Sequence, residues 1–226
     1  MHIALKLERR WREQTKSLTL RDRVWRYSRA ARQGDPSQGW KIHLSATLLT
    51  ANEIFGRALP VLRQHDALFK VPVDLALLGH LNSGNSGFSQ VGKFITAYAR
   101  SDADAIALAR DLHAVTRGFA APKIPFDARY RRNSLVYYRY GAYGAAGRNG
   151  EPTYVLDARG KWHRDRRAPR TAVPNGWKIH FMERPVLFGE RQLVRSDLIT
   201  SSAELSRSAE REVSLRRSIL PLIRLD

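Results

Sequence analysis

Alternating apolar and polar side chains over residues 40–45 predict a β-strand. The segment reads Trp-Lys-Ile-His-Leu-Ser, and this alternation is typical of a strand that buries one face and exposes the other. Because side chains two residues apart on a strand point to the same side, Lys41, His43 and Ser45 should share the polar face. Two basic groups are therefore expected side by side on a sheet.

Three further segments predict strands: 68–71, 93–98 and 129–143. The first carries Lys70, and Pro72 should end it because proline cannot donate a ladder hydrogen bond. In the second, alternation places Lys93 and Ile95 on one face and Tyr98 on the other. The third is rich in arginine and tyrosine and is expected to be one long strand.

Three segments predict helices: 51–65, 74–81 and 101–116. The first has apolar side chains at helical spacing, although Pro60 should kink or divide it. Asp74 stands where the second needs an N-cap, and Ser101 or Asp102 caps the third, because their side-chain oxygens can accept hydrogen bonds from free backbone N–H groups. Strands and helices together predict an α+β fold, a twisted, mostly antiparallel sheet with packed helices.

Composition divides the chain into a basic N-terminal arm or helix, a main domain and a C-terminal extension: 1–38, 39–170 and 171–226. A polar helix is predicted near 203–217 in the extension. The pentapeptide Gly-Trp-Lys-Ile-His occurs at 39–43 and again at 176–180. The residues around the two copies do not match, so no structural repeat is inferred.

Composition and charge limit the possible partners. The 226 residues include 43% hydrophobic ones, enough for a core, and no cysteine, which excludes disulfides, thiolate metal sites and cysteine nucleophiles. The N-terminus lacks a signal peptide's apolar run and no stretch is long and apolar enough to span a bilayer, so we expect a bacterial cytoplasmic protein without membrane contact. A formal net charge of +18 should attract nucleic acid, an acidic peptide or phosphate.

Motifs of the common enzyme classes are absent from the sequence. It contains no P-loop, no dinucleotide-binding glycine pattern, no His-Glu-x-x-His and no nucleophile elbow. Its seven histidines do not cluster at metal-ligand spacing. What remains is a set of basic residues on predicted strands, interleaved with tyrosines: Lys41, His43, Lys70, Lys93, Arg131, Arg139, Tyr98, Tyr138 and Tyr140. Such a set suits a substrate that carries phosphate.

Five segments of this chain occur in an order that is also found in a known family: Trp-Lys-Ile-His-Leu-Ser-Ala (40–46), Leu-Phe-Lys-Val (68–71), Leu-Asn-Ser (81–83), Gly-Lys-Phe-Ile-Thr-Ala-Tyr (92–98) and the Arg/Tyr-rich stretch (129–143). Their order and spacing resemble the N-terminal lyase domain of class III and class IV lanthipeptide synthetases. That domain is similar in turn to the phosphothreonine lyase effectors of pathogenic bacteria. The resemblance covers residues 39–170, including Asp157-x-x-Gly160 and Asp165-Arg166-Arg167.

The resemblance implies a phosphothreonine-lyase-like fold and β-elimination of phosphate from phosphoserine or phosphothreonine, without metal or cofactor. A neutral lysine removes the α-proton, and a protonated histidine donates to the departing phosphate. By matching segments, Lys70 is the base, His43 the acid and Lys41 its neighbour, while the phosphate is held by Arg131, Arg139, Lys93 and Tyr98. The implied partners are a phosphorylated precursor peptide and a Ser/Thr kinase acting in trans or in a parent synthetase. Residues 171–226 would then be a remnant or the start of a kinase-like region.

Elementary chemistry agrees with these roles. A lysine has a pKa of ~10.4 in water, and crowding by cations in a partly buried site makes its amine a better base near neutrality. Negative charge moves onto the bridging oxygen as phosphate leaves, and positioned cations there lower the barrier. One position departs from the family pattern, since its usual arginine ahead of Tyr98 is Phe88 here.

Three alternatives stay open. An effector-like lyase would carry out the same chemistry on a folded phosphoprotein. A basic nucleic-acid-binding module would use Tyr137, Tyr138 and Tyr140 as stacking platforms, although the pattern of Lys41 and His43 has no purpose in that reading. A degenerate, inactive domain kept for peptide binding would account for Phe88.

Overall fold

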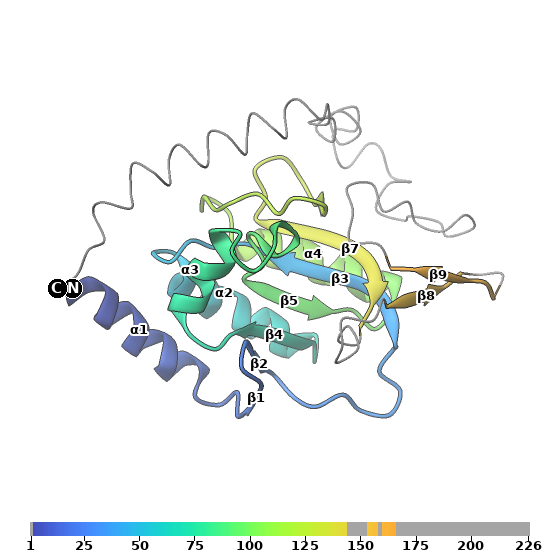
Figure 1. Cartoon of the computed structure of the whole chain (residues 1–226), viewed down its shortest axis with the longest axis horizontal. Coiled ribbons are helices and arrows are strands. Elements are labelled where there is room, and N and C mark those ends of the chain that lie inside the picture. Colours follow the sequence, from blue (N-terminus) through green and yellow to red (C-terminus); the bar gives the residue numbers. More distant parts are fainter. Residues whose placement is uncertain (1, 144–152, 158–159, 166–226) are drawn as a thin grey trace. The chain divides into compact units, whose positions relative to one another are not determined.

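The computed structural model describes residues 2–143, 153–157 and 160–165, all within one compact unit, Met1–Phe188. Its elements, in chain order, are α1 (His2–Thr15), β1 (Leu20–Arg21), β2 (Trp25–Tyr27), β3 (Gln38–Leu44), α2 (Ala51–Gln64), β4 (Leu68–Pro72), α3 (Leu75–Asn82), a 3-10 turn η1 (Phe88–Gln90), β5 (Ile95–Tyr98), α4 (Asp102–Val115), β6 (Ala128–Arg129), β7 (Val136–Ala142), β8 (Tyr154–Leu156) and β9 (Trp162–Arg164) (Figure 1). The extension 171–226, its predicted helix and the second Trp-Lys-Ile-His copy lie outside the described residues.

Seven strands form one sheet in the order β1-β2-β4-β5-β3-β7-β6. Every neighbouring pair in it is antiparallel (Figure 1). Strand β3 pairs along its whole length with β7 on one side, and over Lys41–Leu44 with β5 on the other. Strands β8 and β9 form a separate antiparallel hairpin. The predicted α+β class with a mostly antiparallel sheet is therefore confirmed.

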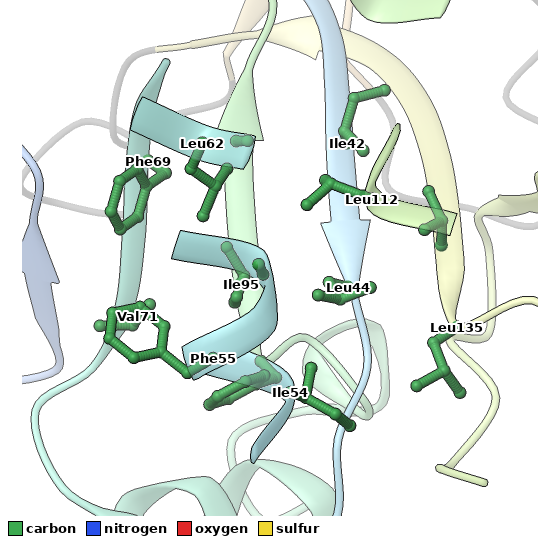
Figure 2. Close-up of a cluster of buried hydrophobic side chains, with 14 of the residues drawn as sticks. Ile42, Leu44, Ile54, Phe55, Leu62, Phe69, Val71, Ile95, Leu112 and Leu135 are labelled. Atoms are coloured by element: carbon green, nitrogen blue, oxygen red, sulfur yellow. The ribbon is translucent and has the colours of Figure 1, made fainter. Parts of the chain in front are cut away.

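The sheet buries one face against helices, because alternate strand residues are apolar. Figure 2 shows strand side chains gathered with those of α2 and α4 in one cluster, which includes Ile42, Leu44, Phe69, Val71, Ile95, Ile54, Phe55, Leu62 and Leu112. All of these side chains are buried. This packing fixes the register of the central strands, because a slip by one residue would turn the apolar side chains to the other face.

Helix α1 contributes to the same core. Trp11 is fully buried, with its ring centroid 5.1 Å from that of Phe55 and 5.4 Å from that of Phe94. The amide of Asn52 on α2 donates to the backbone oxygen of Leu7 at 3.0 Å. The N-terminal segment was expected to hold a helix; the structure adds strands β1 and β2, and β2 extends the sheet by pairing with β4.

The predicted helix caps are confirmed. Asp74 accepts a hydrogen bond from the backbone N–H of Leu77 at 2.7 Å, and Ser101 accepts one from Asp104 at 3.1 Å. Of the two effects expected of Pro60, a division of the helix is wrong, since α2 is a single helix with Pro60 inside it. Pro60 lies on the exposed side of α2, where water can bond the carbonyl that lacks an N–H partner.

The stretch 129–143 is not one strand, so that prediction is wrong. A turn divides it into β6 and β7, closed by a hydrogen bond from Ser134 N–H to the Arg131 carbonyl at 3.0 Å. Asn133 has φ of 60°, a left-handed conformation that asparagine tolerates better than most residues. Arg131 therefore lies in a turn and does not share a strand with Arg139.

The alternation predicted over 93–98 is also wrong at its start. Strand β5 begins at Ile95, after a turn at Gly92, where φ is 75° and the Gly92 carbonyl accepts from Phe94 N–H at 3.0 Å. Phe94 and Ile95 are both fully buried in the core. Lys93 therefore does not share a face with Ile95. Within the described segments, no helix combines the length and apolar character needed to cross a bilayer.

Replacing Trp11 by alanine should lower the free energy of unfolding by roughly 3–5 kcal/mol, because it removes a buried ring and leaves a cavity. The measurement is urea denaturation followed by circular dichroism. Leu5→Ala on the same helix, at a residue that is 60% exposed, is the matched control and should change stability by less than about 0.5 kcal/mol. Equal losses in the two variants would show that α1 is not part of the core.

Candidate functional site

The face of the sheet opposite the apolar core carries a row of polar side chains. Thr96 on β5 is directly opposite Lys70 on β4 and, on its other side, opposite His43 on β3. His43 is in turn opposite Tyr137 on β7. Directly opposed residues of antiparallel strands point to the same face, so the four side chains share it. Lys70 and His43 are separated by one strand, which places their Cα atoms about 9–10 Å apart.

A second row of side chains lies on the same face, two residues further along each strand. Lys41 on β3 is opposite Tyr98 on β5 and Arg139 on β7. Lys41 and Arg139 are each only 7% exposed. Two cations opposite each other repel unless carboxylates lie nearby, so the structure must provide negative charge at this place.

Asp127, in the loop before β6, provides that charge. Its side chain has no exposed surface, and its Oδ2 is 2.5 Å from Nδ1 of His43. Its Oδ1 is 3.9 Å from Nζ of Lys93 and 3.9 Å from Nε of Arg139. We call these four residues the Asp127 cluster. The contact with His43 is short, although it lacks the alignment of a hydrogen bond.

The Asp127 cluster sets the charge states of its own members. Burial acts to raise the pKa of Asp127, but His43, Lys93 and Arg139 together hold that pKa well below its usual range, so the carboxylate stays ionised. Burial lowers the pKa of His43 to about 4, Lys93 and Arg139 act in the same direction, and Asp127 opposes them. At neutral pH the imidazole is therefore uncharged. Because Nδ1 faces the carboxylate, the favoured neutral tautomer carries its proton on Nδ1, and Nε2 is unprotonated.

Arg139 is held by a second carboxylate. Its Nη1 donates to Oδ1 of Asp165 at 2.6 Å and to the carbonyl of Tyr140 at 3.2 Å. Asp165, which directly follows β9, also accepts from the backbone N–H of Ala142 at 3.1 Å. The guanidinium is thus fixed between Asp127 and Asp165.

Lys70 has neighbours of a different kind. Its Nζ lies 4.3 Å from the centroid of the Trp25 ring. Burial acts to raise the pKa of Asp22, but hydrogen bonds from Tyr27 and the backbone, together with the charge of Lys70, lower it overall. An aromatic face and a nearby carboxylate both stabilise an ammonium group.

Arg131 is not brought to the Asp127 cluster by its described contacts. Its guanidinium lies 5.4 Å from the centroid of the Tyr130 ring. The Tyr130 ring belongs to the apolar core and lies 5.6 Å, between centroids, from the ring of His113 on α4. The arginine that joins the polar row is Arg129, which pairs with Tyr137 in the register and donates from Nε to its hydroxyl at 2.7 Å.

Phe88 adds no charge to the site. Its ring, on η1, packs edge-to-face against Phe126 with centroids 5.6 Å apart, and Phe126 directly precedes Asp127 in the chain. The loop that carries Phe88 leads into Lys93, which is the cation that this part of the chain brings to Asp127.

Three residues of the site were missed by sequence reasoning: Asp127, Asp165 and Arg129. Asp127 follows a proline-containing loop with no periodicity, so the local pattern gives no sign of it. Asp165 stands in the Asp-Arg-Arg segment that the family resemblance includes, which was its only signal. Arg129 is only two residues from Arg131. Because the turn after β6 was not predicted, the sequence did not indicate which of the two arginines lies beside Tyr137.

Two of the rings considered as base-stacking platforms are buried. Tyr137 is 3% exposed and Tyr138 is 5% exposed, with the ring of Tyr138 packed 5.9 Å from Trp40. Buried rings cannot stack on bases, which weakens the nucleic-acid hypothesis. Among the residues that the structure describes, no group of three or more His, Asp or Glu side chains is placed to hold a metal ion.

Comparison with known proteins identifies the family. The chain matches the family described as "RamC, N-terminal domain" over residues 4–191. It is also similar to a protein named probable SapB synthase from Streptomyces coelicolor, with 31% identity over 119 residues that make up 53% of this chain. The aligned part spans 13% of that relative's length. Because the family match takes in every strand of the seven-stranded sheet and most of the chain, the protein belongs to the RamC N-terminal domain family.

Proposed function

We propose that this chain removes phosphate from phosphoserine or phosphothreonine in a precursor peptide by β-elimination, in lanthipeptide-type biosynthesis. Similarity to a protein named as a synthase supports a biosynthetic role. The resemblance of the ordered segments to phosphate-eliminating lyase domains suggests the reaction. The observation that carries the proposal is the Asp127 cluster, which lies on the same sheet face as Lys70.

Such a cluster is costly for the fold and therefore points to function. Taking charged groups out of water costs several kcal/mol for each ion unless partners compensate. Here Lys93 and Arg139 lie near the carboxylates of Asp127 and Asp165, Lys41 is opposite Arg139 in the register, and all of these side chains are nearly buried. A phosphate group bound here would place negative charge beside these cations. Perturbed, buried titratable groups of this kind gather at functional sites.

In the proposed reaction the amine of Lys70 takes the α-proton of the phosphorylated residue. The C–H electron pair forms the Cα=Cβ double bond, and the Cβ–O bond breaks so that phosphate leaves with its electron pair. His43 donates a proton to the departing oxygen. The products are a dehydroalanine or dehydrobutyrine residue and inorganic phosphate, and no water is consumed. A peptide laid across β5 would have Lys70 on one side and His43 on the other.

Substrate binding must change the charge states found in the unliganded protein. A phosphate dianion beside His43 raises the pKa of the imidazole, so the ring can take up a proton and serve as the acid. A peptide over β5 would move the Lys70 amine away from Trp25 and from water, and both changes favour the uncharged amine. In this proposal substrate binding brings both His43 and Lys70 into the protonation states that the reaction needs.

Lys70→Ala should lower the elimination rate by a factor of about 10² to 10⁴, because the α-proton then has no base. Binding of the phosphopeptide should persist, since the cations near Asp127 remain. Mass spectrometry of a phosphorylated Ser-rich peptide measures turnover, and fluorescence anisotropy measures binding. Lys16→Ala, at a side chain that is 71% exposed, is the control and should react like wild type. Unchanged turnover in Lys70→Ala would assign the base elsewhere.

Phosphopeptide binding to the Lys70→Ala variant at pH ~7.5, where the phosphate is a dianion, should be accompanied by proton uptake, because this variant neither consumes the peptide nor releases a proton from Lys70. The pKa of His43 is about 4 in the free protein and rises in the complex, so the complex holds more protons than its parts. The His43-dependent affinity should therefore strengthen as pH falls from about 8 to about 6.5. Calorimetry in two buffers of different ionisation enthalpy measures the uptake. Equal uptake by the Lys70→Ala, His43→Asn double variant would show that another group takes the proton.

A further inference from the structure

Asp165 contacts the Arg139 guanidinium through Nη1. Its Oδ1 accepts from Nη1 at 2.6 Å, and its Oδ2 is itself anchored by the backbone N–H of Ala142 at 3.1 Å. The side chains of both ion-pair partners are nearly buried, with 2% exposure for Asp165 and 6% for Arg139. The pair therefore has a defined geometry, unlike an exposed salt bridge that exchanges with water.

The other side of the guanidinium lies near Asp127. Nε of Arg139 is 3.9 Å from Oδ1 of Asp127. In a planar guanidinium Nε and Nη2 form one edge with two parallel N–H donors, which is the edge that grips two oxygens of a phosphate. Because Asp165 occupies Nη1, it turns this two-donor edge toward His43 and Asp127.

Gly141 makes room for the contact. A Cβ atom on this residue would lie 2.7 Å from Oδ2 of Asp165 and 2.9 Å from Nη1 of Arg139. Gly141 is not among the glycines with positive φ, so its backbone does not itself require glycine. Space for the Asp165–Arg139 pair is therefore the physical reason for glycine at this position.

The β8–β9 hairpin holds Asp165 in place. The backbone N–H of Asp165 donates to the Thr153 carbonyl at 2.7 Å. The amide of Gln38, at the start of β3, donates to the Leu156 carbonyl and accepts from the Leu156 N–H, both at 2.7 Å. The hairpin is thus attached to the same strand that carries Lys41 and His43, and this attachment fixes the position of Asp165.

We propose that Asp165 is a positioning residue, which aims the two-donor edge of Arg139 at the phosphate of the substrate. The inference rests on the proposed function, in which Arg139 binds that phosphate. Simple electrostatics predicts the opposite behaviour for Asp165, because a carboxylate near a phosphate site repels the ligand, and neutralising it should strengthen binding. The direction of the change on neutralisation therefore separates the two roles.

The test is the dissociation constant of a phosphoserine peptide, measured in the Lys70→Ala background so that the peptide is not consumed. Asp165→Asn should weaken binding by roughly ten- to a hundred-fold, the range of a hydrogen bond to a charged group. Gly141→Ala, which leaves the charge unchanged and forces the pair apart, should weaken binding in the same way. In an Arg139→Ala background, Asp165→Asn should cause no further loss.

The matched control is Asp157→Asn in the same hairpin. Asp157 accepts from Lys161 N–H at 2.9 Å and contacts His163 at 2.8 Å, so its replacement perturbs the hairpin without touching Arg139. Binding should be unchanged in this variant. Equal weakening by Asp157→Asn, unchanged or tighter binding by Asp165→Asn, or a further loss in the Arg139→Ala background would each overturn the positioning role. Absence of elimination by the wild-type protein would instead reject the proposed function. The binding measurements are independent of that result, because they are made in a variant that does not turn over the peptide.

Discussion

The contact between the buried carboxylate of Asp127 and three basic side chains is the interaction on which the site depends. Without this negative charge, Lys93 and Arg139 would repel each other in a place that water hardly reaches, and His43 would face two cations with no carboxylate between them. With it, positive charge can be concentrated on one face of a sheet whose other face is an apolar core. The buried charges lower the stability of the fold, and they form a basic surface that could bind a phosphate group.

The sheet turns this local interaction into a defined geometry. Packing of α2 and α4 fixes the strand register (Figure 2), and the register sets the spacing across β4, β5 and β3 that separates Lys70 from His43. In the unliganded protein the lysine lies over Trp25 and the imidazole is uncharged. The proposed reaction requires the reverse, so substrate binding must move a side chain and a proton before chemistry begins. The fold holds the strands fixed and leaves these two changes to the substrate.

The sequence predicted what depends on local pattern. Strand positions near His43 and Lys70 and the helix caps follow from alternation and capping chemistry, which act over a few residues. Asp127 could not be predicted, because its role arises from contacts with residues far away in the chain. The face of Lys93 and the strand position of Arg131 were misjudged for a related reason: each lies beside a turn, made by Gly92 or by Asn133, that interrupts the regular strand on which the prediction relied. A single residue in a left-handed conformation is enough to change the face of its neighbours.

In the proposed reaction the chain breaks a Cα–H bond and a Cβ–O bond of one phosphorylated residue. The most direct measurement uses a peptide whose phosphoserine carries deuterium at Cα, incubated with the wild-type protein and analysed by mass spectrometry. The account predicts a dehydroalanine product that has lost the deuterium, together with slower phosphate release than from the undeuterated peptide. A serine product that keeps its deuterium would show phosphate hydrolysis instead, and would contradict the account.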